Sequence, residues 1–193
     1  MEFNIFKQVH KHQTDEQLMS LVFARGSEQA FEELYNRYYK KLLWFSMRLV
    51  GSKEQAEDIV QDTFIKIIDK PAAFNPALKF STWIYTIVNN ACLTNMRNES
   101  QRDKLLTENY VPVHITHLKH SIDVKLIQQK INTLYKDLSS KEQVVFVLRF
   151  EQELSIKEIA AIAQIPEGSV KSCLFYLLKK IAQQLKNYQI TNN

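Results

Sequence analysis

The stretch that decides the fold lies near the C-terminus, where residues 155–172 read SIKEIAAIAQIPEGSVKS. Ser155 and Glu158 form a capping-box pattern, which is typical of a helix start. Ala160 and the alanines beside it leave room for a second helix to cross the first. Pro166 suits the first turn of a following helix, because its missing N–H is not needed there. The stretch therefore predicts a helix, a tight turn and a second helix.

The second of these helices is predicted to begin between Pro166 and Ser169 and to run to about Tyr188. One side carries apolar residues at helical spacing, and the opposite side is polar, aromatic and basic. From residue 170 to the C-terminus there are lysines but no acidic residue. A basic face on a long helix is often only a solvated surface, but the preceding turn favours DNA reading. The candidate DNA-binding residues here are Ser169, Lys171, Ser172, Phe175 and Lys179.

Helical periodicity also dominates the rest of the chain. Only three glycines and four prolines occur in 193 residues, too few for the turns of a sheet-rich fold. The predicted fold class is all-α. Helices are expected over residues 15–25, 28–50, 53–70, 80–94 and 121–138, with a short one opened by Ser139 and Glu142.

The periodicity is lost once, over a polar and histidine-rich stretch. We therefore expect two small helical domains, at residues 14–99 and 121–188, joined by a flexible linker at residues 100–120. The C-terminal domain contains the helix-turn-helix.

Composition excludes several classes of protein. No apolar run approaches the length of a membrane span, and the first residues lack a signal-peptide pattern, so we expect a cytoplasmic protein with no membrane insertion. Cys92 and Cys173 are far apart and are expected to be reduced thiols. No metal site and no cofactor are expected, since His114, His117 and His120 have no acid or cysteine close by. The net charge of +4 is only mildly basic, so charge alone is weak support for nucleic-acid binding.

Several motifs resemble one family, the extracytoplasmic-function sigma factors. Residues 138–150 (LSSKEQVVFVLRF), 154–160 and 168–172 resemble the family's fourth region. The first half resembles its second region, at 30–39 (AFEELYNRYY), 56–64 (AEDIVQDTF) and 80–90 (FSTWIYTIVNN). The resemblance implies a factor that binds RNA polymerase core and promoter DNA, with no catalysis of its own. It also implies contact with the polymerase flap region and with an anti-sigma protein.

The resemblance implies that the third helix docks on the clamp helices of the largest polymerase subunit. Acidic groups around an apolar anchor suit a basic partner, although an ordinary solvated acidic face would look similar. The candidate polymerase-binding residues are Glu54, Glu57, Asp58, Gln61, Asp62 and Phe64.

The resemblance also implies that the loop before the fourth helix, and that helix, capture the −10 element. Phe74 could stack on an unpaired base and Asn75 could hydrogen-bond its edge. Trp83 is expected in the core, and Tyr85 is left undecided. The candidate residues are Phe74, Asn75, Lys79, Asn89, Asn90 and Arg97.

The chain also departs from the family pattern. Cys173 and Tyr176 stand where arginines are usual, and Thr94 replaces a common acidic residue. The resemblance implies that the C-terminal helix-turn-helix reads the −35 element. Because arginine is the best reader of guanine, the −35 preference is expected to differ from that of typical members. Two rival functions are a stand-alone helix-turn-helix regulator, which has no need for an acidic docking helix, and a nucleic-acid enzyme. No catalytic motif supports the enzyme.

Overall fold

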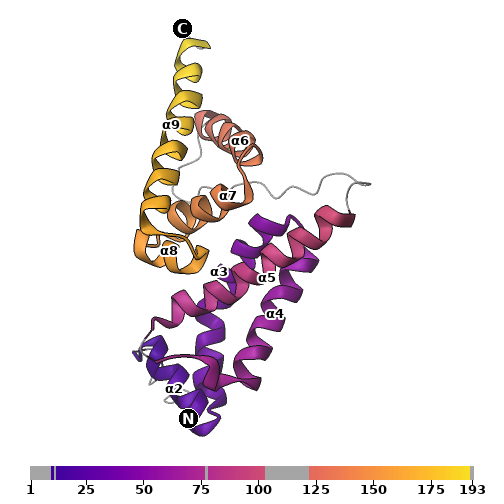
Figure 1. Cartoon of the computed structure of the whole chain (residues 1–193), viewed down its shortest axis with the longest axis vertical. Coiled ribbons are helices and arrows are strands. Elements are labelled where there is room, and N and C mark those ends of the chain that lie inside the picture. The colour runs from indigo at the N-terminus through magenta and orange to yellow at the C-terminus, as the bar shows by residue number, and fades with distance from the viewer. Residues whose placement is uncertain (1–9, 11, 77, 103–121, 192–193) are drawn as a thin grey trace. The chain divides into compact units, whose positions relative to one another are not determined.

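The computed structural model describes residues 10, 12–76, 78–102 and 122–191, and these residues form helices with no strand (Figure 1). This confirms the predicted all-α fold class. The chain divides into two compact units, Met1–Arg102 and Asp103–Asn193. Of the linker expected at residues 100–120, the first three residues belong to a helix. Residues 103–120 lie outside the described part of the chain.

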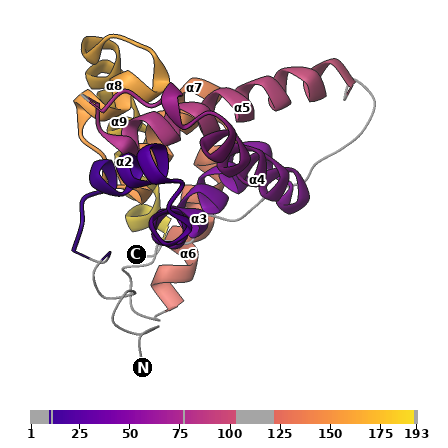
Figure 2. The same cartoon turned by 90° about the horizontal axis from the view of Figure 1, so that it is seen from below.

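Unit 1 is built around one long helix. Its elements are α2 (Asp15–Arg25), α3 (Glu28–Val50), α4 (Lys53–Asp69), the 3-10 turn η1 (Pro71–Ala73) and α5 (Phe80–Arg102). Helix α3 packs against α2, α4 and α5, and Figures 1 and 2 show α3, α4 and α5 side by side. The fully buried large side chains in this unit are Leu18, Met19, Leu34, Leu42, Phe45, Ile67, Phe80 and Ile84.

Local capping signals account for the helix boundaries of unit 1. The Ser27 and Ser52 side chains accept hydrogen bonds from backbone N–H groups in the first turns of α3 and α4. Gly26 and Gly51 end α2 and α3 with left-handed φ values of 58° and 75°, which glycine adopts without steric cost. Helix α5 extends to Arg102, beyond the decay expected from residue 95. No proline or glycine interrupts this stretch.

Unit 2 is organised around its last helix. It comprises α6 (Ile122–Lys136), α7 (Ser140–Phe146), the π-helical turn η2 (Val147–Glu151), α8 (Ile156–Ala163) and α9 (Glu167–Thr191). Helices α6, α7 and α8 all pack against α9. The π-helical turn was not expected from the sequence. It buries Val147 and Leu148.

Candidate DNA and polymerase surfaces

Helices α8 and α9 form the predicted helix-turn-helix. The Ser155 hydroxyl and the Glu158 carboxylate cap α8 reciprocally, as the sequence predicted. Gln164 ends α8 at a φ of 55°, in the left-handed region, and donates its N–H to the Ala160 carbonyl. The Pro166 carbonyl then accepts hydrogen bonds from Ser169 and from the next residue at the start of α9. The turn therefore sets the direction in which α9 leaves α8.

One face of α9 is in the core and the opposite face is exposed. Val170 and Leu177 are fully buried, whereas Phe175 is 65% exposed. Phe175 lies about 160° around the helix from Leu177. Lys171 and Lys179 are exposed on the same side as Phe175, one turn before and one turn after it. The exposed face is thus an aromatic ring between two cations.

The remaining candidates on α9 are small or half-buried. Ser172 is exposed, and its hydroxyl donates to the Gly168 carbonyl at 3.0 Å. Ser169 is half-buried. A Cβ added at Gly168 would meet nothing within 4 Å, so internal packing does not require a glycine there. Tyr176, which stands where the family usually has arginine, is exposed and packs edge-on against the Phe175 ring at 5.6 Å.

The acidic candidates of α4 lie at the surface. Glu54, Asp58, Gln61 and Asp62 are exposed, and Glu57 is half-buried with a carboxylate oxygen 3.5 Å from Lys53. A backbone N–H and the Ser52 hydroxyl bind the Glu54 carboxylate, and they lower the pKa of this group.

Phe64 does not belong to this surface, which corrects the expectation that it is an exposed anchor. Its side chain is 4% exposed. Its ring packs edge-on against Phe31 at 5.9 Å and lies tilted against Tyr35 at 4.8 Å. The ring fills the space between α3 and α4. In this conformation it cannot reach a partner.

Two isoleucines supply the exposed apolar surface that Phe64 does not. Ile65 and Ile68 are each 53% exposed, and at helical spacing they continue the face that carries Asp58 and Gln61. Neither isoleucine was among the polymerase-binding residues predicted from the sequence. The available signal was that Ile65 falls outside the three-and-four spacing of the buried residues.

The segment before α5 is only partly available for DNA. Asn75 and Lys79 are exposed. Phe74 is 7% exposed, with its ring 5.2 Å from Trp83 and 5.7 Å from Phe80, so it is a core residue in this structure and not an open stacking platform. Trp83, which was expected in the core, is half-buried, with its ring against Phe74 and Phe80.

On α5 the two neighbouring asparagines differ. Asn90 and Arg97 are exposed, whereas Asn89 is 1% exposed. Asn89 shares the buried face with Tyr85 and Val88, so it is not accessible to DNA in this conformation. The structure also decides the position of Tyr85, which is in the core, with its ring edge-on to Phe45 at 5.4 Å.

The described residues offer neither a metal site nor a membrane-spanning helix. In the described part of the chain no three histidine, cysteine or acidic side chains come together as a metal site, and His114, His117 and His120 fall outside it. Within the same residues, no helix combines the length and the apolar character needed to cross a bilayer. Cys92 and Cys173 are free thiols.

The geometry defines an all-helical protein of two units, one of which contains a helix-turn-helix with a basic outer face, and comparisons identify its family. The family model "Sigma-70 region 2" matches residues 34–102, and "Sigma-70, region 4" matches residues 136–183. Together the two matches cover more than half of the chain.

Curated relatives extend over almost the whole chain. The ECF RNA polymerase sigma factor SigW of Bacillus subtilis is 28% identical over 173 residues, which are 84% of this chain and 92% of SigW. The ECF RNA polymerase sigma-E factor of Haemophilus influenzae is 27% identical over 188 residues, 90% of this chain and 96% of that protein.

Two solved structures share the fold. CnrH, in complex with the cytosolic domain of CnrY, matches with a TM-score of 0.67 and 19% identity, over 91% of this chain and 99% of CnrH. The sigma factor RpoE from Bartonella quintana, in complex with the anti-sigma factor NepR, matches with a TM-score of 0.64 and 24% identity, over 81% of this chain and 96% of RpoE.

The chain belongs to the sigma-70 family of transcription initiation factors, in its extracytoplasmic-function group. As a sigma factor it binds RNA polymerase core and directs it to promoters. The main function is therefore that of a sigma factor and not that of a stand-alone regulator.

Proposed function

We propose which surfaces carry the two tasks of this sigma factor. Unit 2 reads the −35 element with the exposed face of α9, namely Lys171, Ser172, Phe175 and Lys179, with Ser169 at its edge. The observation that carries this assignment is the position of Phe175 between two lysines on the open face of a helix-turn-helix. Such a helix places its N-terminal half in the major groove, where lysines contact phosphates and the ring contacts base edges.

Unit 1 binds polymerase through α4. We assign the contact to the exposed acids Glu54, Asp58 and Asp62, to Gln61 and the half-buried Glu57, and to Ile65 and Ile68 in place of Phe64. Acidic groups steer the encounter with the basic clamp helices of the largest subunit, and the isoleucines bury apolar surface once docked. We also assign to unit 2 the contact with the flap region of polymerase, because of the family resemblance.

The −10 element is assigned to the segment before α5 and to α5 itself. Asn75 and Lys79 lead into the helix, and Asn90 and Arg97 are exposed along it. Amide groups can bind base edges and the cations can bind phosphates. Phe74 and Asn89 would join this surface only if their side chains left the core on DNA binding.

Three further assignments rest on the family. The chain performs no bond chemistry, since phosphodiester synthesis belongs to polymerase, and it acts in the cytoplasm, where the polymerase is. It is held silent by an anti-sigma protein. Support for this partner comes from CnrH and RpoE, which were solved with CnrY and with an anti-sigma factor.

The polymerase surface is tested by Ile65→Asp. Because Ile65 is half exposed, a charge there should leave the fold intact yet weaken core binding at least about tenfold in a pull-down or titration. The matched control is Phe23→Asp on α2, where the side chain is 60% exposed but lies outside the assigned surface. Equal core affinity for both variants would refute the assignment to α4. Run-off transcription with core polymerase on a genomic promoter library then tests promoter use.

A further inference from the structure

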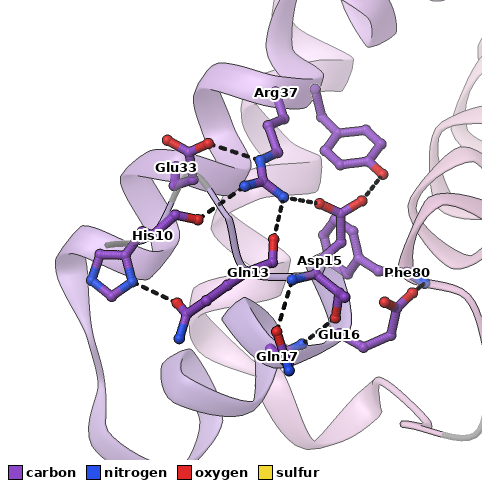
Figure 3. A network of polar contacts seen from close by, with 10 residues as sticks. His10, Gln13, Asp15, Glu16, Gln17, Glu33, Arg37 and Phe80 are labelled. Carbon is purple, nitrogen blue, oxygen red and sulfur yellow. Dashed lines mark hydrogen bonds and ion pairs between the residues drawn. The ribbon is translucent and has the colours of Figure 1, made fainter. Parts of the chain in front are cut away.

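Phe80, the first residue of α5, is held by groups from three other segments of unit 1. Its backbone N–H donates to the Glu16 carboxylate at 3.0 Å, and Glu16 lies in the first turn of α2 (Figure 3). Its ring packs edge-on against Tyr38 at 5.3 Å and Phe74 at 5.7 Å. Helices α2 and α3 and the segment before α5 therefore meet at this residue.

The start of α5 needs an acceptor from elsewhere. The first N–H groups of a helix have no partner within the helix and carry partial positive charge. Helix α5 has no acidic residue in its first turn, and the residue before it is Lys79. Glu16 supplies the missing carboxylate from a position 64 residues earlier in the chain. It therefore acts as a tertiary cap for α5.

Asp15, the residue before Glu16, is held in place by a polar network with α3. The Arg37 guanidinium donates to the Asp15 carboxylate at 2.7 Å, to the Glu33 carboxylate at 2.8 Å and to the Gln13 carbonyl at 2.9 Å (Figure 3). The other oxygen of Asp15 accepts a hydrogen bond from the hydroxyl of Tyr38, the residue after Arg37. Asp15 and Glu16 are adjacent, and they accept hydrogen bonds from the Tyr38 hydroxyl and the Phe80 N–H. The start of α2 is therefore linked both to α3 and to the start of α5.

We propose that Glu16 is a positioning residue for −10 recognition. By capping α5 it fixes the first turn of that helix, and with it the point where residues 78–79 enter the helix. This inference rests on the proposed role of the segment before α5, and of α5 itself, in binding the −10 element. Residues 10–33 precede the part of the chain that matches sigma-70 region 2. Through Glu16, this N-terminal part contributes to promoter recognition.

The test compares Glu16→Ala and Glu16→Gln in full-length protein bound to core polymerase. The probe is a single-stranded, fluorescently labelled non-template −10 oligonucleotide from a promoter that the holoenzyme uses. Loss of a hydrogen bond to a charged acceptor should lower −10 affinity by up to about tenfold in E16A. E16Q keeps an oxygen acceptor and should recover most of the affinity. Core binding and −35 duplex binding should change less than twofold in both.

The control is Glu33→Gln, which removes one ion pair from the same Arg37 network but leaves the Phe80 N–H capped. It should bind the −10 oligonucleotide within twofold of wild type. Amide hydrogen exchange in the free proteins provides a second measurement. Exchange in residues 80–83 should accelerate in E16A and stay near the wild-type rate in E33Q.

Either of two results would overturn the inference. One is an E16A protein whose −10 affinity and exchange rates equal those of wild type. The other is an equal loss in core, −35 and −10 binding, which would show a general effect on folding. If the wild-type holoenzyme itself failed to bind the −10 oligonucleotide, the proposed −10 surface would be wrong, and the inference would fall with it.

Discussion

Replacing Phe175 by alanine should weaken binding to −35 DNA without changing its electrostatics. The ring is 65% exposed in the free protein. Full burial of a phenylalanine side chain contributes about 1.5–3 kcal/mol, so covering the exposed two thirds contributes about 1–2 kcal/mol. This corresponds to a loss of about 5- to 30-fold in affinity. Because Lys171 and Lys179 remain, the dependence of affinity on salt concentration should be the same in both proteins.

The chemistry of the ring predicts what it contacts. Phenylalanine has no hydrogen-bond donor, and the apolar group in the major groove is the thymine methyl. Replacing thymidine by deoxyuridine in the −35 duplex removes only that methyl. The affinity of wild-type protein for the duplex should then fall about fourfold. The F175A protein should not distinguish the two bases. The combined changes form a double-mutant cycle on a single contact.

The assay is fluorescence anisotropy with the holoenzyme on −35 duplexes, selected first by transcription from a library randomised in the −35 element. Phe150→Ala, which changes an exposed phenylalanine of unit 2 outside α9, is the control. Equal binding of wild-type protein to the thymidine and deoxyuridine duplexes at every position would contradict the predicted methyl contact. An F175A protein that keeps the full dependence on the methyl group would contradict the assignment of that contact to Phe175.

Three further predictions concern stability and thiol chemistry in unit 2 and unit 1. Glu142→Ala should lower the free energy of unfolding of unit 2 by about 1–2 kcal/mol in urea titrations, because the capping bonds to Ser139 and the 2.7 Å ion pair with Lys180 are both lost. Glu142→Gln should cost only about 0.5 kcal/mol, since the ion pair is partly exposed, and equal losses would show that the cap is unimportant. The hydrogen bond from Lys180 lowers the pKa of Glu142, so its contribution is present above pH 4.5 and lost as the pH falls through the folded-state pKa. The difference between wild type and E142Q should therefore disappear in acid, and a difference that grows there would contradict the sign. Burial raises the pKa of the Cys92 thiol to about 11, so iodoacetamide at pH 8 should label the half-buried Cys173 first and Cys92 only after unfolding, as read by peptide mass.

Helix boundaries could be predicted from the sequence because they depend on near neighbours. The capping serines 27, 52, 139 and 155 and the glycines at 26 and 51 act within one turn, and the helices begin and end beside them. The helix-turn-helix followed in the same way from residues 155–172. The exposed face of α9 was predictable too, since its buried and exposed residues keep a regular helical spacing.

The exposure of single side chains on α4 and α5 could not be read in this way. Phe64 and Ile65 are adjacent and both apolar, yet one fills the space between α3 and α4 and the other faces solvent. Phe74 and Asn89 looked like DNA contacts and lie in the core. Which apolar or polar residue is covered depends on where other helices cross, and those contacts join residues far apart in the chain.

The pairing of Glu16 with the Phe80 N–H is the clearest case of what tertiary structure alone decided. No local pattern in α2 or α5 indicates it, because 64 residues separate the two partners. The sequence by itself determined the helices, their order and the basic reading helix, since these follow from interactions within a few residues. The packing of α2, α3 and α5 determined which groups meet at the start of α5, because only the folded chain brings them within hydrogen-bonding distance.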